Sequence, residues 1–104
     1  MINVSVMYPN SADVKFNKEY YCNKHIPLIS QLLGDAIKDI QVSFGLVGAS
    51  IDEAPAFIAM VFMTFDSIEA FQTAFGPHAQ RLVNDIPNYT NAQAQIQISE
   101  IASK

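Results

Sequence analysis

His25 is the residue whose type and surroundings best suit acid–base chemistry. On a helical wheel it lies inside an apolar arc, in line with Tyr21, Leu28 and Leu32. An imidazole titrates near pH ~6.5 and can work in either protonation state at neutral pH. Two interpretations fit this position: a buried neutral histidine that bonds to backbone carbonyls, or a general acid/base that lines a cavity. The spacing alone leaves both open.

Two residues late in the chain could support such a site. Asp85 could orient His25 or act as a second acid/base, or it could cap the turn at Ile86-Pro87, a frequent use of aspartate. Tyr89 could bond to a substrate oxygen, or it could anchor the last strand as a half-buried side chain. His78 follows Gly76-Pro77 and is expected at the surface.

Aromatic and aliphatic side chains are expected to line the cavity around these groups. Such a pocket suits a small, mostly apolar organic ligand that carries one or two oxygens. Cys22, the single cysteine, is expected to face the core as an inert apolar residue. The candidate lining residues are Phe16, Tyr20, Tyr21, Phe44, Met60, Phe62 and Phe75.

The sequence contains no recognisable cofactor or metal motif. Its four glycines are scattered, so no glycine-rich phosphate loop is present. His25, His78 and Asp85 have no helical ligand spacing, and the lone cysteine excludes a thiolate zinc site. We therefore expect any enzyme activity to need neither a cofactor nor a metal.

Composition excludes several classes of partner. The 104 residues are half apolar and 15% charged, with a net charge of −4, and Arg81 is the only arginine. Such a chain lacks the basic surface that nucleic acids require. No apolar run approaches the roughly 20 residues of a membrane span, and no secretory signal opens the sequence. A cytoplasmic protein with a single domain over residues 1–104 is expected.

The elements that position His25 follow from hydrophobic periodicity. Alternation predicts strands over residues 2–8, 40–46, 57–65 and 95–101. Helical patterns precede Gly34 and cover residues 68–75, with a further short helix after Gly76-Pro77. The order β-α-β-β-α-β predicts an α+β, ferredoxin-like protomer: a four-stranded antiparallel sheet with helices on one face.

The strand at residues 57–65 is apolar on both faces, so both faces of the sheet need cover. Two helices cover only one face of a four-stranded sheet. We therefore expect a homodimer in which two copies pack their sheets face to face.

The first helix contains its own conflict. Cys22, Ile26, Ile29 and Leu33 form one apolar stripe, whereas Phe16 and Tyr20 point nearly the opposite way. Pro27 removes a helical donor and clashes with the Asn23 carbonyl. The sequence therefore predicts a kink or break near residues 23–27, with His25 at the bend.

The motif Tyr20-Tyr21-x-x-x-His25-x-Pro27-Leu28, with a Phe-rich late helix and Asp85-x-x-x-Tyr89, resembles the EthD family. That family is named after a protein needed for bacterial ethyl tert-butyl ether degradation and belongs to the dimeric α/β-barrel superfamily. The resemblance implies a barrel-forming dimer and a pocket in which His25 is the signature polar group. Its usual oxidoreductase label rests on association with an oxidative pathway. Tyr21 stands where the family often has tryptophan, so no substrate is carried over.

Two functions are therefore expected. The first is a cofactor-independent enzyme of small-molecule catabolism or secondary metabolism, an isomerase or an oxygenase, with His25 and Asp85 as catalytic residues. Tyr20, Tyr21, Tyr89, Phe16 and Phe75 would bind its substrate. The second is a non-catalytic accessory or ligand-binding protein that supports a separate oxidative enzyme.

Overall fold

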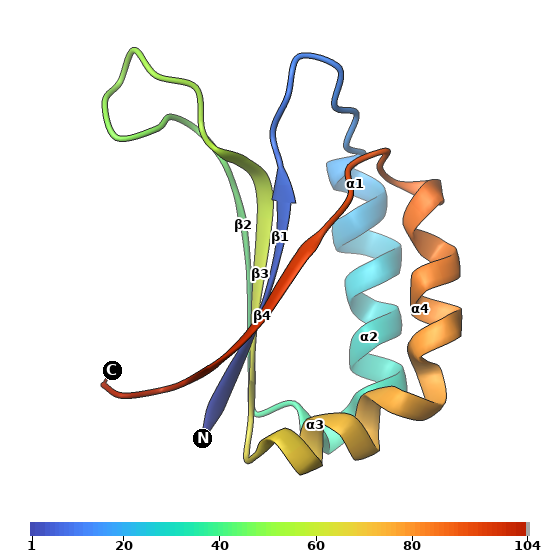
Figure 1. Cartoon of the computed structure of the whole chain (residues 1–104). Helices are drawn as coiled ribbons and strands as arrows, with labels where there is room; N and C mark the ends of the chain where they lie inside the picture. The colour runs from blue at the N-terminus through green and yellow to red at the C-terminus, as the bar shows by residue number, and fades with distance from the viewer. Residues whose placement is uncertain (104) are drawn as a thin grey trace.

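A four-stranded antiparallel sheet with helices on one face forms the molecule (Figure 1). The computed structural model describes residues 1–103. The strands follow the order β2-β3-β1-β4 across the sheet. This arrangement confirms the predicted ferredoxin-like protomer. The strand bounds are β1 Ile2–Pro9, β2 Asp39–Phe44, β3 Phe57–Phe65 and β4 Gln95–Glu100.

Two helical layers pack side by side against that face. The first contains α1 (Lys18–Tyr20), a π-helical turn η1 (Tyr21–His25) and α2 (Ile26–Leu33). It ends as predicted at Gly34, whose φ of 56° suits a residue without a Cβ. A short 3-10 turn, η2 (Gly34–Ala36), then leads from α2 to β2. The second layer comes after β3 in the chain. That layer contains α3 (Ile68–Phe75), 3-10 turn η3 (Gly76–His78), α4 (Ala79–Asp85) and 3-10 turn η4 (Ile86–Asn88).

The core between sheet and helices has an aliphatic end and an aromatic end. The aliphatic end contains Ile29, Leu33 and Leu82 against the inward residues of β1 and β3. At the aromatic end, Tyr8, Tyr21 and Tyr89 pack together with Ala59. Three tyrosine hydroxyls are thereby buried at the aromatic end, and that end is where the candidate site lies.

The other face of the sheet carries an apolar stripe that no helix covers. Met60 pairs with Met7, and Phe62 pairs with Ser5, both on the face away from the helices. Met60 and Phe62 therefore cannot line a cavity between helices and sheet, which corrects the prediction for these two residues. Successive side chains of a strand point to opposite faces. Because Ala59 and Val61 of β3 are buried toward the helices, Met60 and Phe62 point the other way.

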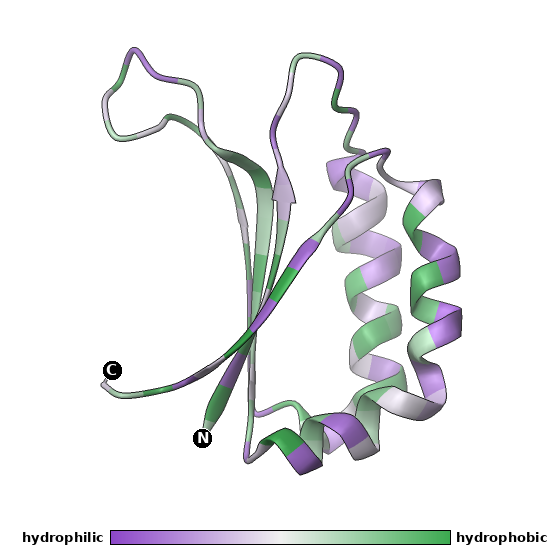
Figure 2. Ribbon diagram, viewed as in Figure 1, coloured by the Kyte–Doolittle hydropathy of each residue, from purple (hydrophilic) through white to green (hydrophobic). Residues whose placement is uncertain are grey.

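The segment of residues 45–56 projects away from the sheet on the side opposite the helices (Figure 1). This segment includes apolar stretches (Figure 2). Two of its apolar residues, Leu46 and Ile51, are 87% and 84% exposed. Leu46 was predicted to end a strand, but β2 stops at Phe44. Over residues 1–103, the helices are all too short or too polar to cross a membrane.

Candidate active site

The first helix contains a π-helical turn that aims His25 into the core. The backbone N–H of Ile26 bonds to the carbonyl of Tyr21, five residues back, which widens the turn. Pro27 then falls in the first turn of α2, directly after this widened turn. An irregularity is therefore present near the predicted residues 23–27, in the form of a π-helical turn through which the helix continues into α2.

This turn changes which residues face inward. Tyr21, His25 and Ile29 form the buried stripe, whereas Cys22 is exposed. The prediction that Cys22 faces the core is wrong, because it assumed a regular helical period through the proline. The rings of Tyr21 and His25 stack with centroids 5.5 Å apart and an angle of 17°. Tyr21 and His25, two residues of the predicted motif, are thus neighbours on the buried side of the first helix.

Asp85, the last residue of α4, fixes the orientation of His25. The His25 Nδ1 atom lies 2.8 Å from Asp85 Oδ2. The hydroxyl of Tyr20 donates to Asp85 Oδ1 at 2.7 Å, and the Asn88 side-chain amide donates to the same oxygen at 3.0 Å. Asp85 makes no side-chain hydrogen bond to the backbone of η4, so its capping alternative is not what the fold uses.

The charges of this pair follow from burial and hydrogen bonding. Burial raises the pKa of the Asp85 carboxyl, but the hydrogen bonds from Asn88, His25 and Tyr20 outweigh it and hold the pKa below its ordinary value of 3.8. Burial lowers the pKa of His25 below 6.5, and the Asp85 carboxylate opposes this shift only in part. His25 is therefore neutral at pH 7.

The tautomer of His25 follows from its partners. A carboxylate only accepts hydrogen bonds, so Nδ1 carries the proton that is donated to Asp85. The unprotonated Nε2 lies 3.4 Å from the hydroxyl of Tyr89. Nε2 is consequently a lone-pair acceptor on the cavity side of the ring, as a general base requires.

Three tyrosine hydroxyls lie buried around this nitrogen. Tyr8 and Tyr89 share a hydrogen bond of 2.8 Å between their hydroxyl oxygens. Among residues 1–103, no group meets the Tyr21 hydroxyl in hydrogen-bond geometry, although the nearby Tyr8 hydroxyl influences its pKa. Burial raises the pKa of all three groups, so each is a neutral hydroxyl. Sequence reasoning missed Tyr8, although its place at the end of the inward face of β1, after Ile2, Val4 and Val6, was the available signal.

A cavity of about 90 Å³ lies against these groups, between the sheet and both helical layers. It exceeds the roughly 30 Å³ that one water occupies in the liquid. Its polar lining residues are His25 and the three tyrosines. The remaining lining residues are apolar: Val6, Ile29, Val61, Met63, Phe75, Leu82, Val83, Ile86, Ala94 and Ile96.

The predicted lining residues are thus divided. Tyr21, Tyr89 and Phe75 contact the cavity, whereas Phe16, Tyr20 and Phe44 do not. Phe16 lies behind the wall, with its ring centroid 5.0 Å from that of Tyr21. Tyr20 reaches the site from outside through Asp85. Phe16 and Tyr20 can therefore influence a ligand only through the residues they support.

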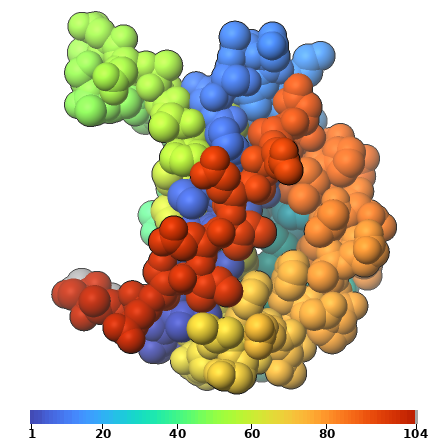
Figure 3. Space-filling view, viewed as in Figure 1, coloured from blue at the N-terminus to red at the C-terminus, as the bar shows by residue number. Residues whose placement is uncertain are grey.

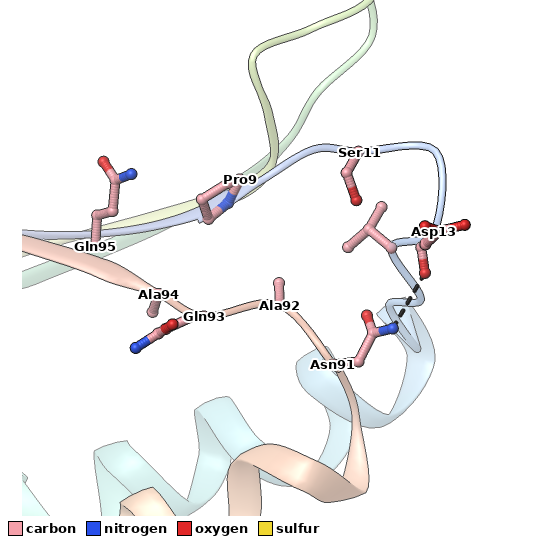
Figure 4. A pocket seen from close by; sticks show the side chains of 9 residues that line it. Pro9, Ser11, Asp13, Asn91, Ala92, Gln93, Ala94 and Gln95 are labelled. Atoms are coloured by element: carbon pink, nitrogen blue, oxygen red, sulfur yellow. Dashed lines mark hydrogen bonds between the residues drawn. The ribbon is translucent and has the colours of Figure 1, made fainter.

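A larger surface groove of about 630 Å³ lies apart from His25, where β4 separates from β1 (Figure 4). Its lining includes Ser11, Asp13, Asn91 and Gln93, and the side-chain amide of Asn91 donates to the backbone carbonyl of Asp13 at 3.1 Å. The groove has no titratable pair comparable to His25 and Asp85. Its volume therefore does not make it the stronger candidate site. Within residues 1–103, no three His, Cys, Asp or Glu side chains form a potential metal site.

Comparison with known proteins identifies relatives over nearly the whole chain. The EthD domain family model matches residues 11–93. A search of curated proteins found no match. An EthD-like protein from Ralstonia eutropha JMP134 is 38% identical, with a TM-score of 0.94, and the match covers 99% of this chain and 93% of that one.

Two more distant structures share the fold. An ethyl tert-butyl ether degradation (EthD) family protein from Bacillus halodurans C-125 is 19% identical, with a TM-score of 0.67, over 97% of this chain and 98% of that one. A candidate monooxygenase from Shewanella loihica PV-4 is 12% identical, with a TM-score of 0.62, over 99% and 95% of the two chains. At these identities the likeness concerns the fold.

Proposed function

Because the chain belongs to the EthD family, we propose that it is a cofactor-independent enzyme that uses His25 as a general base on a small, apolar, oxygen-bearing molecule. The observation that carries this proposal is the 2.8 Å contact between His25 Nδ1 and Asp85 Oδ2. The second ring nitrogen, Nε2, accepts a long hydrogen bond of 3.4 Å from the Tyr89 hydroxyl, on a residue that lines a cavity of hydroxyls and apolar groups. This is the arrangement in which an orienting carboxylate, a base and a reacting atom can align.

Catalysis would begin with transfer of one proton. Nε2 takes a proton from an acidic C–H or phenolic O–H of the substrate, and the imidazolium that forms is stabilised by the carboxylate of Asp85. The electron pair left behind moves onto the substrate oxygen as an enolate or phenolate. Neutral tyrosine hydroxyls near the base can donate to that oxygen, as in an oxyanion hole.

Two reactions can follow from this enolate or phenolate intermediate. Return of the proton from Nε2 to a different carbon gives an isomer, with no other reactant. Alternatively, the carbanion is oxidised by molecular oxygen: a CH₂ group and O₂ give a carbonyl group and water. Dioxygen is then the oxidant, and one of its atoms leaves as water. An oxidation of this kind agrees with the oxidative association of the family.

Hydrogen–deuterium exchange at carbon tests the proposal without knowledge of the natural substrate. The probe is 2-indanone in deuterated buffer, and proton NMR follows loss of its α-hydrogen signal. Wild type should exceed the buffer rate, and His25→Gln should lose roughly 10²- to 10⁴-fold of that acceleration. His78→Gln is the matched control and should retain the wild-type rate. An oxygen electrode in the same sample separates exchange alone from oxygenation.

Equal exchange by wild type and His25→Gln would remove His25 from this role. The strongly apolar lining of the cavity then favours the second function, a protein that binds an apolar metabolite for a separate oxidative enzyme. In that case His25→Gln would weaken binding of the metabolite without any turnover to lose.

The sheet face opposite the helices supports a homodimer. Met7, Met60 and Phe62 present apolar side chains there, and the projecting segment of residues 45–56 adds exposed Leu46 and Ile51 on the same side. A second copy of this face would bury an apolar surface that one chain leaves in water. The dimer would thus cover the face of the sheet opposite the cavity.

A further inference from the structure

Every polar side chain that lines the cavity is buried, and the exposed side chains that line it are apolar. Tyr21, Tyr8 and His25 are 0%, 2% and 4% exposed, whereas Val83 and Ile96 are 52% and 63% exposed. All five line the same cavity. The hydroxyls and the imidazole therefore lie in the buried part of the cavity, which they share with apolar residues such as Val61 and Leu82, and the rim at the surface is apolar.

The opening lies between β4 and α4. Figure 3 shows a hollow there, with atoms of α2 visible at its base between the two elements. Val83 belongs to α4 and Ile96 to β4, on the two sides of the hollow. Ile98 lies two residues further along β4, is 38% exposed and does not line the cavity. Val83 and Ile96 thus form the exposed rim of the cavity of about 90 Å³.

The Tyr21 hydroxyl is the second independent observation. It is fully buried on a residue that lines the cavity and makes no hydrogen bond within residues 1–103, although the neighbouring Tyr8 hydroxyl influences its pKa. Leaving a buried hydroxyl unpaired is costly, so such a group indicates a partner that is not part of the chain. As the neutral Nε2 of His25 accepts and the Tyr21 hydroxyl can donate, a ligand hydroxyl or enol is the group that can satisfy both.

The geometry points to a ligand of defined shape: a phenol or enol whose oxygen binds between Tyr21 and His25, and whose apolar substituent, para to that oxygen, leaves through the rim of Val83 and Ile96. This inference rests on the proposed site and names its substrate class. The rim selects for an apolar tail because each methylene placed between Val83 and Ile96 leaves water.

Calorimetric binding of phenol and of its 4-methyl, 4-ethyl and 4-propyl derivatives tests the direction of the ligand. For wild type, each added carbon should strengthen binding roughly fourfold, as expected for a buried methylene. Ile96→Ser and Val83→Ser should flatten the series, because both residues line the cavity at its rim. Ile98→Ser, on the same strand but outside the cavity, should keep the wild-type slope.

Tyr21→Phe tests the polar end. It should weaken every member of the phenol series by a similar factor, roughly fivefold to tenfold for one lost hydrogen bond, and should leave the matching alkylbenzenes unaffected. Equal weakening of phenols and alkylbenzenes would show a packing effect and overturn the assignment. If the affinity of wild type did not rise along the phenol series, the proposed exit of the tail at the rim would be wrong. The exit would also be wrong if the affinity rose only in a monomeric variant, because a second copy would then cover the rim.

These outcomes are distinct from those of the exchange assay. Binding is measured without turnover, so a normal alkylphenol series with no exchange of 2-indanone would contradict only the catalytic role of His25. A flat series with normal exchange would contradict only the orientation of the ligand.

Discussion

The imidazole of His25 and the carboxylate of Asp85 form a contact of 2.8 Å between side chains that lie 60 residues apart in the chain. One comes from a widened turn of the first helix, and the other from the last residue of α4. Two separate helical layers therefore have to be packed correctly before the pair exists. Tyr20, on the same helix as His25, closes the arrangement by donating to the other oxygen of Asp85.

Asp85→Asn should disable the base while preserving its shape. The Asp85 carboxylate raises the pKa of His25 against the effect of burial, so the amide should lower the imidazole pKa further below 6.5. It should also reduce exchange of 2-indanone by roughly 10²-fold or more, since the imidazolium loses its counter-charge. Imidazole NMR of the variant measures the first effect and the exchange assay the second. A raised His25 pKa in Asp85→Asn would contradict this arrangement.

The free energy of unfolding should depend on pH through His25. Its pKa is lowered in the folded state, so the unfolded chain takes up the proton first as pH falls below 6.5. Stability should therefore be complete above 6.5 and decrease below it. Asp85, whose pKa is also lowered, adds a second loss that begins below 3.8. Urea titrations at several pH values should show a smaller loss just below pH 6.5 in His25→Gln than in wild type.

Tyr21→Phe should make the protein more stable although it weakens phenol binding. The substitution removes a buried hydroxyl that has no partner, and we expect the free energy of unfolding to rise by about 1 kcal/mol. Tyr89→Phe is the matched control, because it breaks the hydrogen bond to Tyr8 and should lower stability by about the same amount. Chemical denaturation measures both. Destabilisation by Tyr21→Phe would show that this hydroxyl has a partner within the protein.

Phe62→Glu should separate the proposed homodimer into monomers. The substitution places a charge in the middle of the uncovered sheet face, where a second copy would otherwise bury Phe62. Gln72→Glu adds the same charge on exposed α3 and should leave the dimer intact. Sedimentation velocity at micromolar concentration gives the mass of each. A wild type that sediments as a monomer would contradict the dimer outright.

Hydrophobic periodicity was sufficient to predict the protomer. Alternation in β1 and β3 and the glycine stop at Gly34 each reflect a local rule that the fold obeys. The ferredoxin-like order followed from these elements alone. The face assignment of Met60 and Phe62 failed because β3 is apolar on both sides, so its composition cannot tell the helix side from the open side.

The site was less accessible to sequence reasoning. The π-helical turn adds one residue to a helical repeat, so a regular wheel misplaced Cys22 and gave no reason for a continuous helix through Pro27. The pairing of His25 with Asp85 could be suspected from chemistry, but its distance depends on how two helices pack. The inward face of β1 could have suggested Tyr8 as a site residue, but its hydrogen bond to Tyr89 depends on how the chain folds.

Imidazole NMR through a pH titration tests the central claim most directly, because the chain contains only two histidines. A His78→Gln variant assigns the His25 signals. We predict a His25 pKa below 6.5, a proton on Nδ1 above that pKa, and a shift of the His25 signals when 4-ethylphenol is added. A His25 that titrates at or above 6.5, or whose signals ignore the phenol, would contradict a neutral base facing a ligand cavity.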